Sequence, residues 1–198
     1  MQVKQRNSGF TLVELLVTAA VLAIVSMFAI PAFQTLVMNN RITSQTNQLS
    51  SQLAYARSEA TKRASGFITL CPTSDSATCS GNATWESGWL VFFDLDGDRT
   101  VDAADDVVRQ VVEPLDGGNT LRVSGLTDTS YVQFDRNGQP LPSAVGASPA
   151  GTFTVCDSRG AGEARAVVVA VSGQTRLAQD EDADGIPNAH TGNNISCP

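Results

Sequence analysis

The chain has 198 residues, of which 42% are apolar and 17% are charged, a balance that predicts one folded domain plus an additional element. Its formal net charge is -7 at pH 7, and a field of this sign repels polyanions, which argues against broad electrostatic binding of nucleic acid. One histidine, His190, and four cysteines without a C-x-x-C spacing argue against a zinc site.

The first element is an apolar segment from Asn7 to Val37, which follows a polar leader that contains Lys4 and Arg6. Basic residues before an apolar run predict an amino end in the cytoplasm. A cleaved secretory signal would have a shorter apolar core, of about 7–15 residues. A plain membrane anchor matches a length of about 20 residues. It leaves Glu14 unexplained, because a carboxylate in hydrocarbon costs at least about 2.5–3.5 kcal/mol.

The motif SGFTLVELL, residues 8–16, resembles the processing signal of type IV pilins and of type II secretion pseudopilins. The resemblance implies that prepilin peptidase cleaves between Gly9 and Phe10 and that Phe10 is then N-methylated. It also implies that Glu14 pairs with the terminal amine of a neighbouring subunit, and a charge in lipid is tolerated when it is paired. Pro31 matches the proline that breaks the helix in this family.

The polar segment after the apolar run keeps a helical period. An apolar stripe recurs at spacings of four, three and four residues, formed by Leu49, Leu53, Ala56 and Ala60. Proline is absent from residues 32–71, so we expect the helix to continue to near Ala64 and to stop at Gly66. The stripe should pack on the domain that follows.

The helical spacing of the apolar residues ends at Gly66. About seven short segments rich in β-branched or aromatic residues follow, separated by turn formers: GFITLC, GWLVFFD, DVVRQVVE, TLRVSG, SYVQFD, GTFTVC and RAVVVAV. Their spacing favours an antiparallel sheet, and SGQ before TRLA predicts a hairpin turn. The predicted fold class is α+β, a long N-terminal helix packed on an antiparallel β domain. The predicted parts are a cleaved leader (1–9), a transmembrane and assembly helix (10–38), an amphipathic helix (39–64), a β head (65–178) and an acidic loop with a tethered tail (179–198).

A stretch of the predicted β head makes the resemblance to a family more specific. The stretch WESGWLVFFDLDGDRTVDAADDVVR is similar to the GspH/FimT/FimU group of minor pilins and pseudopilins, at Trp85, Gly88, Trp89, Phe92, Asp94 and Arg109. YARSEATKR, residues 55–63, also resembles the end of the helix in this group.

Membership of this group would imply a structural protein rather than an enzyme, a minor type IV pilin that takes part in pilus assembly. Its partners would be other pilins or pseudopilins and prepilin peptidase. Before assembly it would lie in the inner membrane with a periplasmic head, and afterwards in the pilus fibre. A GspH-like pseudopilin of type II secretion is an alternative.

The four cysteines allow three pairings. Their even number after a membrane segment predicts two disulfides in an oxidising compartment. Sequence neighbours are the favoured partners, which pairs Cys71 with Cys79 and Cys156 with Cys197. The second bond would tether the tail.

The acidic segment DLDGDRTVDAAD matches the spacing of a twelve-residue calcium loop. Oxygen ligands would stand at loop positions 1, 3, 5, 7, 9 and 12, which are Asp94, Asp96, Asp98, Thr100, Asp102 and Asp105. Arg99 occupies position 6, where glycine makes the sharp turn, and Asp105 is shorter than the usual glutamate. A solvated acidic turn is the alternative, and no other cofactor is expected.

The segment DEDADGIPN, residues 180–188, has acids at positions 1, 3 and 5 and Gly185 at position 6. Thr191 stands at position 12 in place of an acid, so a flexible polar loop is favoured over a second calcium site. His190 is interpreted as a loop residue.

A DNA-binding role is the second functional hypothesis. DNA-uptake members of the group have a basic GR.R turn late in the β domain, and this chain has GQTR at residues 173–176. Arg165 and Arg176 would contact phosphates. Four acidic residues follow within residues 180–184, so binding would be weak and salt-sensitive, and DNA is disfavoured as a partner.

Overall fold

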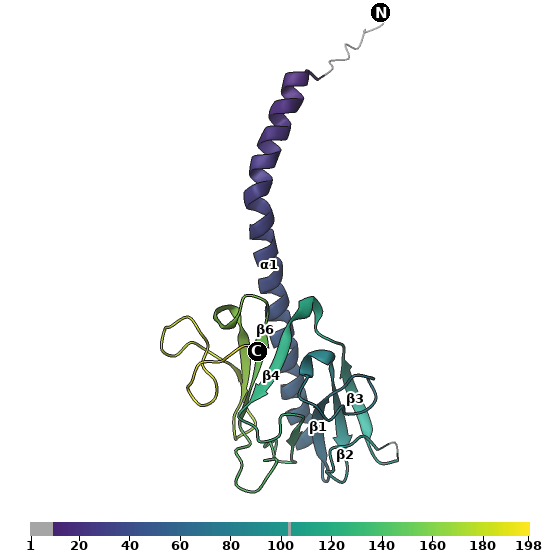
Figure 1. Cartoon of the computed structure of the whole chain (residues 1–198). Coiled ribbons are helices and arrows are strands. Elements are labelled where there is room, and N and C mark those ends of the chain that lie inside the picture. Colours follow the sequence, from purple (N-terminus) through teal and green to yellow (C-terminus); the bar gives the residue numbers. More distant parts are fainter. Residues whose placement is uncertain (1–9, 103) are drawn as a thin grey trace, which may run out of the picture. The chain divides into compact units, whose positions relative to one another are not determined.

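The structure is a computed structural model that describes residues 10–102 and 104–198. The chain forms two compact units, residues 1–40 and residues 41–198. Helix α1 (Leu12–Thr61) runs through both, and all the strands belong to the second unit, which we call the head (Figure 1). The predicted α+β class is therefore confirmed.

The head begins with residues 41–61 of α1, which make nearly six turns. Seven side chains are buried here, at helical spacing: Ile42, Gln45, Thr46, Leu49, Leu53, Ala56 and Ala60. The predicted apolar stripe is part of this set, and Leu49, Leu53 and Ala56 are fully buried. Propensity alone gives a helix little stability in water, so this burial stabilises the segment.

The helix ends earlier than predicted, at Thr61 rather than near Ala64. Its last turn tightens, because the N–H groups of Lys62 and Arg63 bond to carbonyls only three residues back. Gly66 then has a positive φ of 75°, and a Cβ there would lie 2.7 Å from the ring of Phe93. Glycine is thus required where the chain turns into the first strand.

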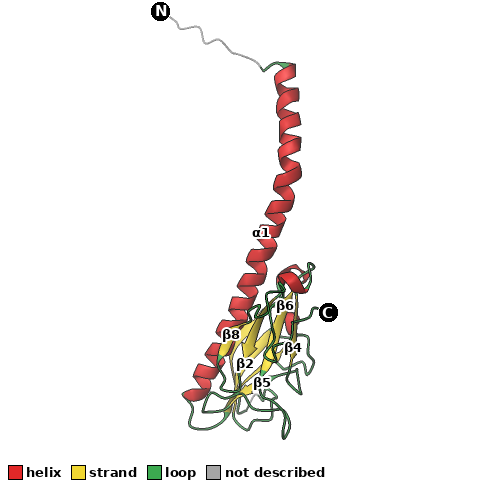
Figure 2. Ribbon diagram, turned by 90° about the vertical axis from the view of Figure 1, so that its left-hand side faces the viewer, coloured by secondary structure: helices red, strands yellow, loops and turns green. Residues whose placement is uncertain are grey.

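Eight strands form two antiparallel four-stranded sheets (Figure 2). The first sheet has the order β3-β2-β1-β5, built from β1 (Phe67–Pro72), β2 (Trp89–Asp94), β3 (Val107–Val112) and β5 (Val132–Phe134). The second has the order β4-β6-β7-β8, built from β4 (Thr120–Ser124), β6 (Gly151–Cys156), β7 (Arg165–Val169) and β8 (Thr175–Leu177). Short 3₁₀ helices are η1 (Trp85–Ser87), η2 (Asp116–Gly118) and η3 (Ala161–Glu163).

All seven predicted strand segments are present, and TRLA forms β8 after the predicted hairpin turn. The division into two sheets was not predicted. It arises because β4 pairs with β6, so that Thr120 lies opposite Cys156, whereas β5 pairs back to β1.

One core joins both sheets to α1. Trp85 is fully buried, and its Nε1 donates to the carbonyl of Thr129 at 2.7 Å. Its ring packs edge-to-face with that of Phe153, with the ring centroids 5.1 Å apart. Trp89 is also fully buried. Such aromatic burial accounts for much of a small domain's stability.

A buried polar clamp joins α1 to the segment before β4. The side chain of Gln45 donates to the carbonyl of Asp116 at 3.1 Å and accepts from the side-chain amide of Asn119 at 2.7 Å. Gln45 and Asn119 are buried, so the paired hydrogen bonds offset the cost of burying both amides.

Both disulfides are present with the predicted pairing, Cys71 with Cys79 and Cys156 with Cys197. The tail covers the outer face of the second sheet, where Ala189 and Ile195 pack on Ala166. His190 is more than a loop residue, because its N–H and Nδ1 both lie 2.9 Å from Thr152 Oγ1. The tail is therefore tethered by packing and hydrogen bonds as well as by the bond to Cys197.

Candidate functional site

The first unit displays an apolar surface. Within the described residues 10–40 no side chain is buried, and Phe10 is 84% exposed. By length and composition, α1 is able to cross a membrane. The large exposed side chains are Phe10, Leu12, Val13, Leu15, Leu16, Val17, Val21, Leu22, Ile24, Val25, Met27, Phe28, Ile30, Phe33, Leu36 and Val37.

Thr11 and Glu14 begin the helix. The hydroxyl of Thr11 accepts the Glu14 N–H at 3.2 Å, which satisfies one of the free donors of the first turn. The spacing T-x-x-E is that of a capping box, a signal that the sequence analysis missed. The carboxylate of Glu14 makes no hydrogen bond or ion pair with any described residue. It is thus free for an intermolecular partner, near the partial positive charge of the helix start.

The predicted break at Pro31 is not observed, because α1 continues through it. Proline lacks the N–H that would bond to the carbonyl of Met27. The hydroxyl of Thr35 bonds to the carbonyl of Pro31 at 3.1 Å one turn later. The helix therefore tolerates one missing hydrogen bond between two intact turns. The predicted cleavage site at Gly9 and the basic leader lie outside the described residues.

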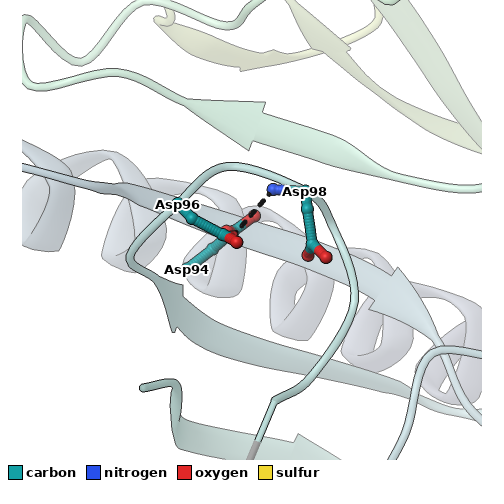
Figure 3. Close-up of side chains that lie close together, drawn as sticks. All are labelled: Asp94, Asp96 and Asp98. Atoms are coloured by element: carbon teal, nitrogen blue, oxygen red, sulfur yellow. Dashed lines mark hydrogen bonds between the residues drawn. The ribbon is translucent and has the colours of Figure 1, made fainter. Parts of the chain in front are cut away.

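The acidic loop after β2 is organised around Asp94 (Figure 3). This side chain is fully buried and accepts hydrogen bonds from Thr69 Oγ1 and Gln133 Nε2, each at 2.8 Å. It also accepts the N–H groups of Gly97 at 2.7 Å and Arg99 at 3.1 Å. Burial raises the pKa of Asp94 above its ordinary value, against these hydrogen bonds. Asp94 is therefore the structural centre of the loop.

The left-handed turn that a calcium loop needs at position 6 is made by Arg99 itself. Its φ is +70°, and its guanidinium lies 4.5 Å from the centre of the Tyr131 ring. A residue other than glycine pays about 1–2 kcal/mol for this conformation, and the cation–π contact and the bond to Asp94 offset it. The absence of glycine thus does not prevent the turn.

Among the described residues, the structure brings together three carboxylates of the predicted ligand set. The carboxylates of Asp94, Asp96 and Asp98 have oxygens within 4.8 Å of one another. Asp98 Oδ1 is bonded to the N–H of Thr100 at 2.8 Å, and these bonds lower the pKa of Asp98. The nearby negative charge of Asp98 raises the pKa of Asp102.

The loop is closed by Asp106, the residue after the predicted ligand at position 12. Its carboxylate accepts the N–H groups of Leu95 and Asp102, each at 3.0 Å. Calcium binding, with Asp105 at position 12, stays a prediction.

The second acidic loop is held in place rather than free. Asp180 accepts the Gly185 N–H at 2.8 Å, which lowers its pKa, and Asp184 bonds to the side-chain amide of Asn194 in the tail. The carboxylates of Asp180, Asp182 and Asp184 converge within 4.8 Å. These contacts describe a hydrogen-bonded turn.

The two arginines proposed to contact phosphates do not converge. Arg176 lies opposite Val168 in the β7–β8 register, so the two side chains share a face of the sheet. Arg165 precedes Val168 by three residues on β7, which is an odd number. Successive side chains of a strand point to opposite faces, so Arg165 and Arg176 belong to opposite faces of the sheet. Arg176 also pairs with Glu181 at 3.5 Å. The geometry therefore provides no joint phosphate site from this pair.

Comparison with known proteins matches two family models. Residues 45–175 match the model described as type II transport protein GspH, and residues 4–30 match the prokaryotic N-terminal methylation motif. No curated protein matches the chain.

Two solved structures of the type IV minor pilin FimU of Pseudomonas aeruginosa are similar. The crystal form in space group P21 has a TM-score of 0.54 and 18% identity, and the match covers 73% of this chain and 92% of that one. The form in space group P65 has a TM-score of 0.48 and 18% identity, over 69% and 92% of the two chains. The first match shows that the fold is shared.

Proposed function

Because the chain belongs to the GspH family, we propose that it acts by assembly, as a minor type IV pilin that helps to initiate or complete a pilus. The observation that supports this most is the contrast within α1. Its first half exposes a largely apolar surface, and its second half is embedded in a folded head. The apolar half of such a helix can pack against the helices of similar subunits, while the head remains outside the bundle that these helices form.

In this proposal, prepilin peptidase cleaves between Gly9 and Phe10, and Phe10 is methylated at its new amino end. The N-terminal methylation motif that covers residues 4–30 supports this processing. Residues 10–38 would form the membrane and assembly segment, with the head in the periplasm. Two disulfides favour an oxidising compartment of that kind.

Glu14 would set the register of assembly. It lies four residues after Phe10, about one helical turn. In a bundle of subunits, its carboxylate would pair with the terminal amine of a neighbour, because an unpaired charge in lipid is costly. Among the described residues this carboxylate has no partner, which supports the role.

A pseudopilin of type II secretion is the second candidate, favoured by the description of the matching family model. The assembly chemistry would be the same, and only the machine would differ. A strain that lacks the gene should be scored for surface pili, secreted proteins and DNA uptake. Loss of pili, with uptake falling in step, supports the minor pilin.

Loss of secretion with normal pili would assign the chain to the secretion machine. Normal pili and secretion with lost uptake would instead indicate a DNA receptor. In that case the phosphate contacts would have to come from residues other than a joint Arg165–Arg176 site.

A further inference from the structure

Strand β8 has a row of backbone groups without a partner. It is the last strand of its sheet, and hydrogen bonds from Ala170 N to Gln174 O at 2.9 Å and from Ala178 N to Ala166 O at 2.8 Å set its pairing with β7. In an antiparallel pair, alternate residues bond to the neighbour, so Thr175 and Leu177 direct their N–H and C=O groups to the free side. Among the described residues, no hydrogen bond uses these four groups.

A groove lies between this edge and α1. Its volume is about 460 Å³, and the helix wall is made of short side chains around one arginine: Ala54, Arg57, Ser58 and Thr61. Gln174 and Thr175 form the strand wall. In Figure 2, β8 lies beside the last turns of α1. The short side chains leave space for another extended chain beside β8.

The groove is locally positive in an acidic protein. Arg57 is the charged residue among the described residues that line it, and none of these residues carries a carboxylate. The Nε of Arg57 donates to the carbonyl of Gly138 at 3.2 Å, which fixes the side chain and leaves the two Nη groups for another partner. An incoming carboxylate would form a charge-assisted hydrogen bond there.

The other sheet edges are less accessible to a new strand. The segment after β5 covers that strand, since Leu141 N donates to Gln133 O at 2.8 Å. Strand β3 pairs with β2 through a bulge between Val91 and Phe92, and bulges hinder edge pairing. Strand β4 borders the C-terminal tail, which contributes residues 191 and 193–198 to the groove beside it.

We propose that the β8 groove binds an extended acidic segment of a partner protein, which adds to the sheet as a fifth strand. The backbone of the segment would bond to Thr175 and Leu177, and one of its carboxylates would meet Arg57. This is strand addition, in which main-chain bonds give affinity and side-chain pockets give specificity. The inference is independent of which machine the protein serves.

A second copy of this chain fits the groove less well. If β8 paired with β8 of another copy about a twofold axis in the register that uses both outward residues, Thr175 would face Leu177 of the other copy and Arg176 would lie opposite Arg176. Like charges that face each other across strands are destabilising. We therefore assign the groove to a different polypeptide.

The test is photo-crosslinking of the full chain in its native cells. A benzoylphenylalanine at Ser58, on the helix wall, should crosslink to a partner protein, and mass spectrometry should map the site to an extended segment with carboxylates. Leu177→Pro removes one outward N–H and spares the inward bonds to β7, so the crosslinking yield should fall about tenfold. Leu177→Ala is the matched control and should retain the yield.

Three further variants test charge and space. Arg57→Gln should lower the yield, whereas Arg57→Lys should retain most of it. Ala54→Trp should block the groove from the helix side without touching β8, which keeps the test valid if Leu177→Pro fails to fold. Thermal unfolding of each variant reports whether the head is intact.

Three results would overturn the proposal. One is the absence of any crosslink in wild-type cells. Another is a crosslink to nucleic acid, to lipid, or to a protein segment without carboxylates. The third is a yield that survives both Leu177→Pro and Ala54→Trp in folded protein.

Discussion

The two halves of α1 have the same secondary structure and different environments. Residues 12–40 contain no buried side chain, whereas residues 41–61 contain seven. The second half is held by the head core, which makes it part of one cooperative unit. The first half contributes nothing to that core, so its apolar side chains are available to lipid or to other subunits. Substitutions in the two halves should therefore affect different properties.

The largest expected effect is on assembly. Glu14→Ala should leave processing, membrane insertion and head folding intact, and should reduce incorporation into fibres at least about tenfold. The reason is that an unpaired charge in lipid costs about 2.5–3.5 kcal/mol. Immunoblots of sheared fibres against whole cells measure it. Glu59→Ala, in the other half of the helix, is the control and should incorporate normally. Normal incorporation of Glu14→Ala would remove the pairing argument.

Of the two halves of α1, only the second should affect the stability of the head when a side chain is shortened. Leu53→Ala should lower the free energy of unfolding by about 2–5 kcal/mol, because Leu53 is fully buried. Leu22→Ala, where the side chain is 70% exposed, should change it by less than about 0.5 kcal/mol. Denaturant titration of the full chain in detergent micelles compares them. Equal losses would show that the two halves unfold as one unit.

The disulfide that tethers the tail should stabilise the head by an amount similar to that of the Leu53 side chain. Replacing Cys156 and Cys197 together with serine should lower the free energy of unfolding by about 2–4 kcal/mol, since the bond closes a loop of 41 residues. Peptide mapping of the oxidised wild-type protein should find two bridges and no free thiol. A free Cys197 thiol would contradict the tethered tail.

Asp94→Asn tests the buried loop centre. The amide replaces an acceptor with a donor, which faces at least one of the donors around Asp94. The expected loss is about 1–3 kcal/mol in thermal unfolding of the full chain. Asp96→Asn is the control, because Asp96 is exposed and accepts one weak bond from Asp98 N at 3.2 Å. If both variants lost the same stability, Asp94 would not be the centre of the loop.

The smallest effect is a dependence on pH in the turn closed by Cys71 and Cys79. Hydrogen bonds from the side chain and N–H of Thr78 lower the pKa of Asp75 below its ordinary 3.8. A lowered pKa in the folded state means that Asp75 stabilises the head above about pH 4, and that this contribution is lost as the pH falls further. Melting temperatures between about pH 6 and 2 should fall less steeply for Asp75→Asn than for the wild type. Identical slopes would contradict this role.

Much of the fold was predictable because its signals are local. The stripe of Leu49, Leu53 and Ala56 lies within a few helical turns, and the strand segments are bounded by turn formers. Cys71 and Cys79 are eight residues apart, so their pairing was favoured by proximity.

The remainder depends on contacts between distant segments. Arg165 and Arg176 are close in the sequence, but the register of β7 and β8 places them on opposite faces of the sheet. Asp106 closes the acidic loop through a bond to Leu95, 11 positions away, which the spacing of the acidic residues does not encode. The clamp of Gln45 with Asn119 joins residues 74 positions apart. No local pattern predicts such a pair.

The buried indole rings of Trp85 and Trp89 have a practical consequence. Both tryptophans of the chain, and both tyrosines, follow residue 41, so the assembly half of α1 has no such chromophore. Intrinsic fluorescence excited in the tryptophan band therefore reports on the head alone. The purified chain in a micelle can be heated while this signal marks head unfolding, and the helical signal in circular dichroism follows α1 as a whole. The protein thus contains its own optical label for separating the two events.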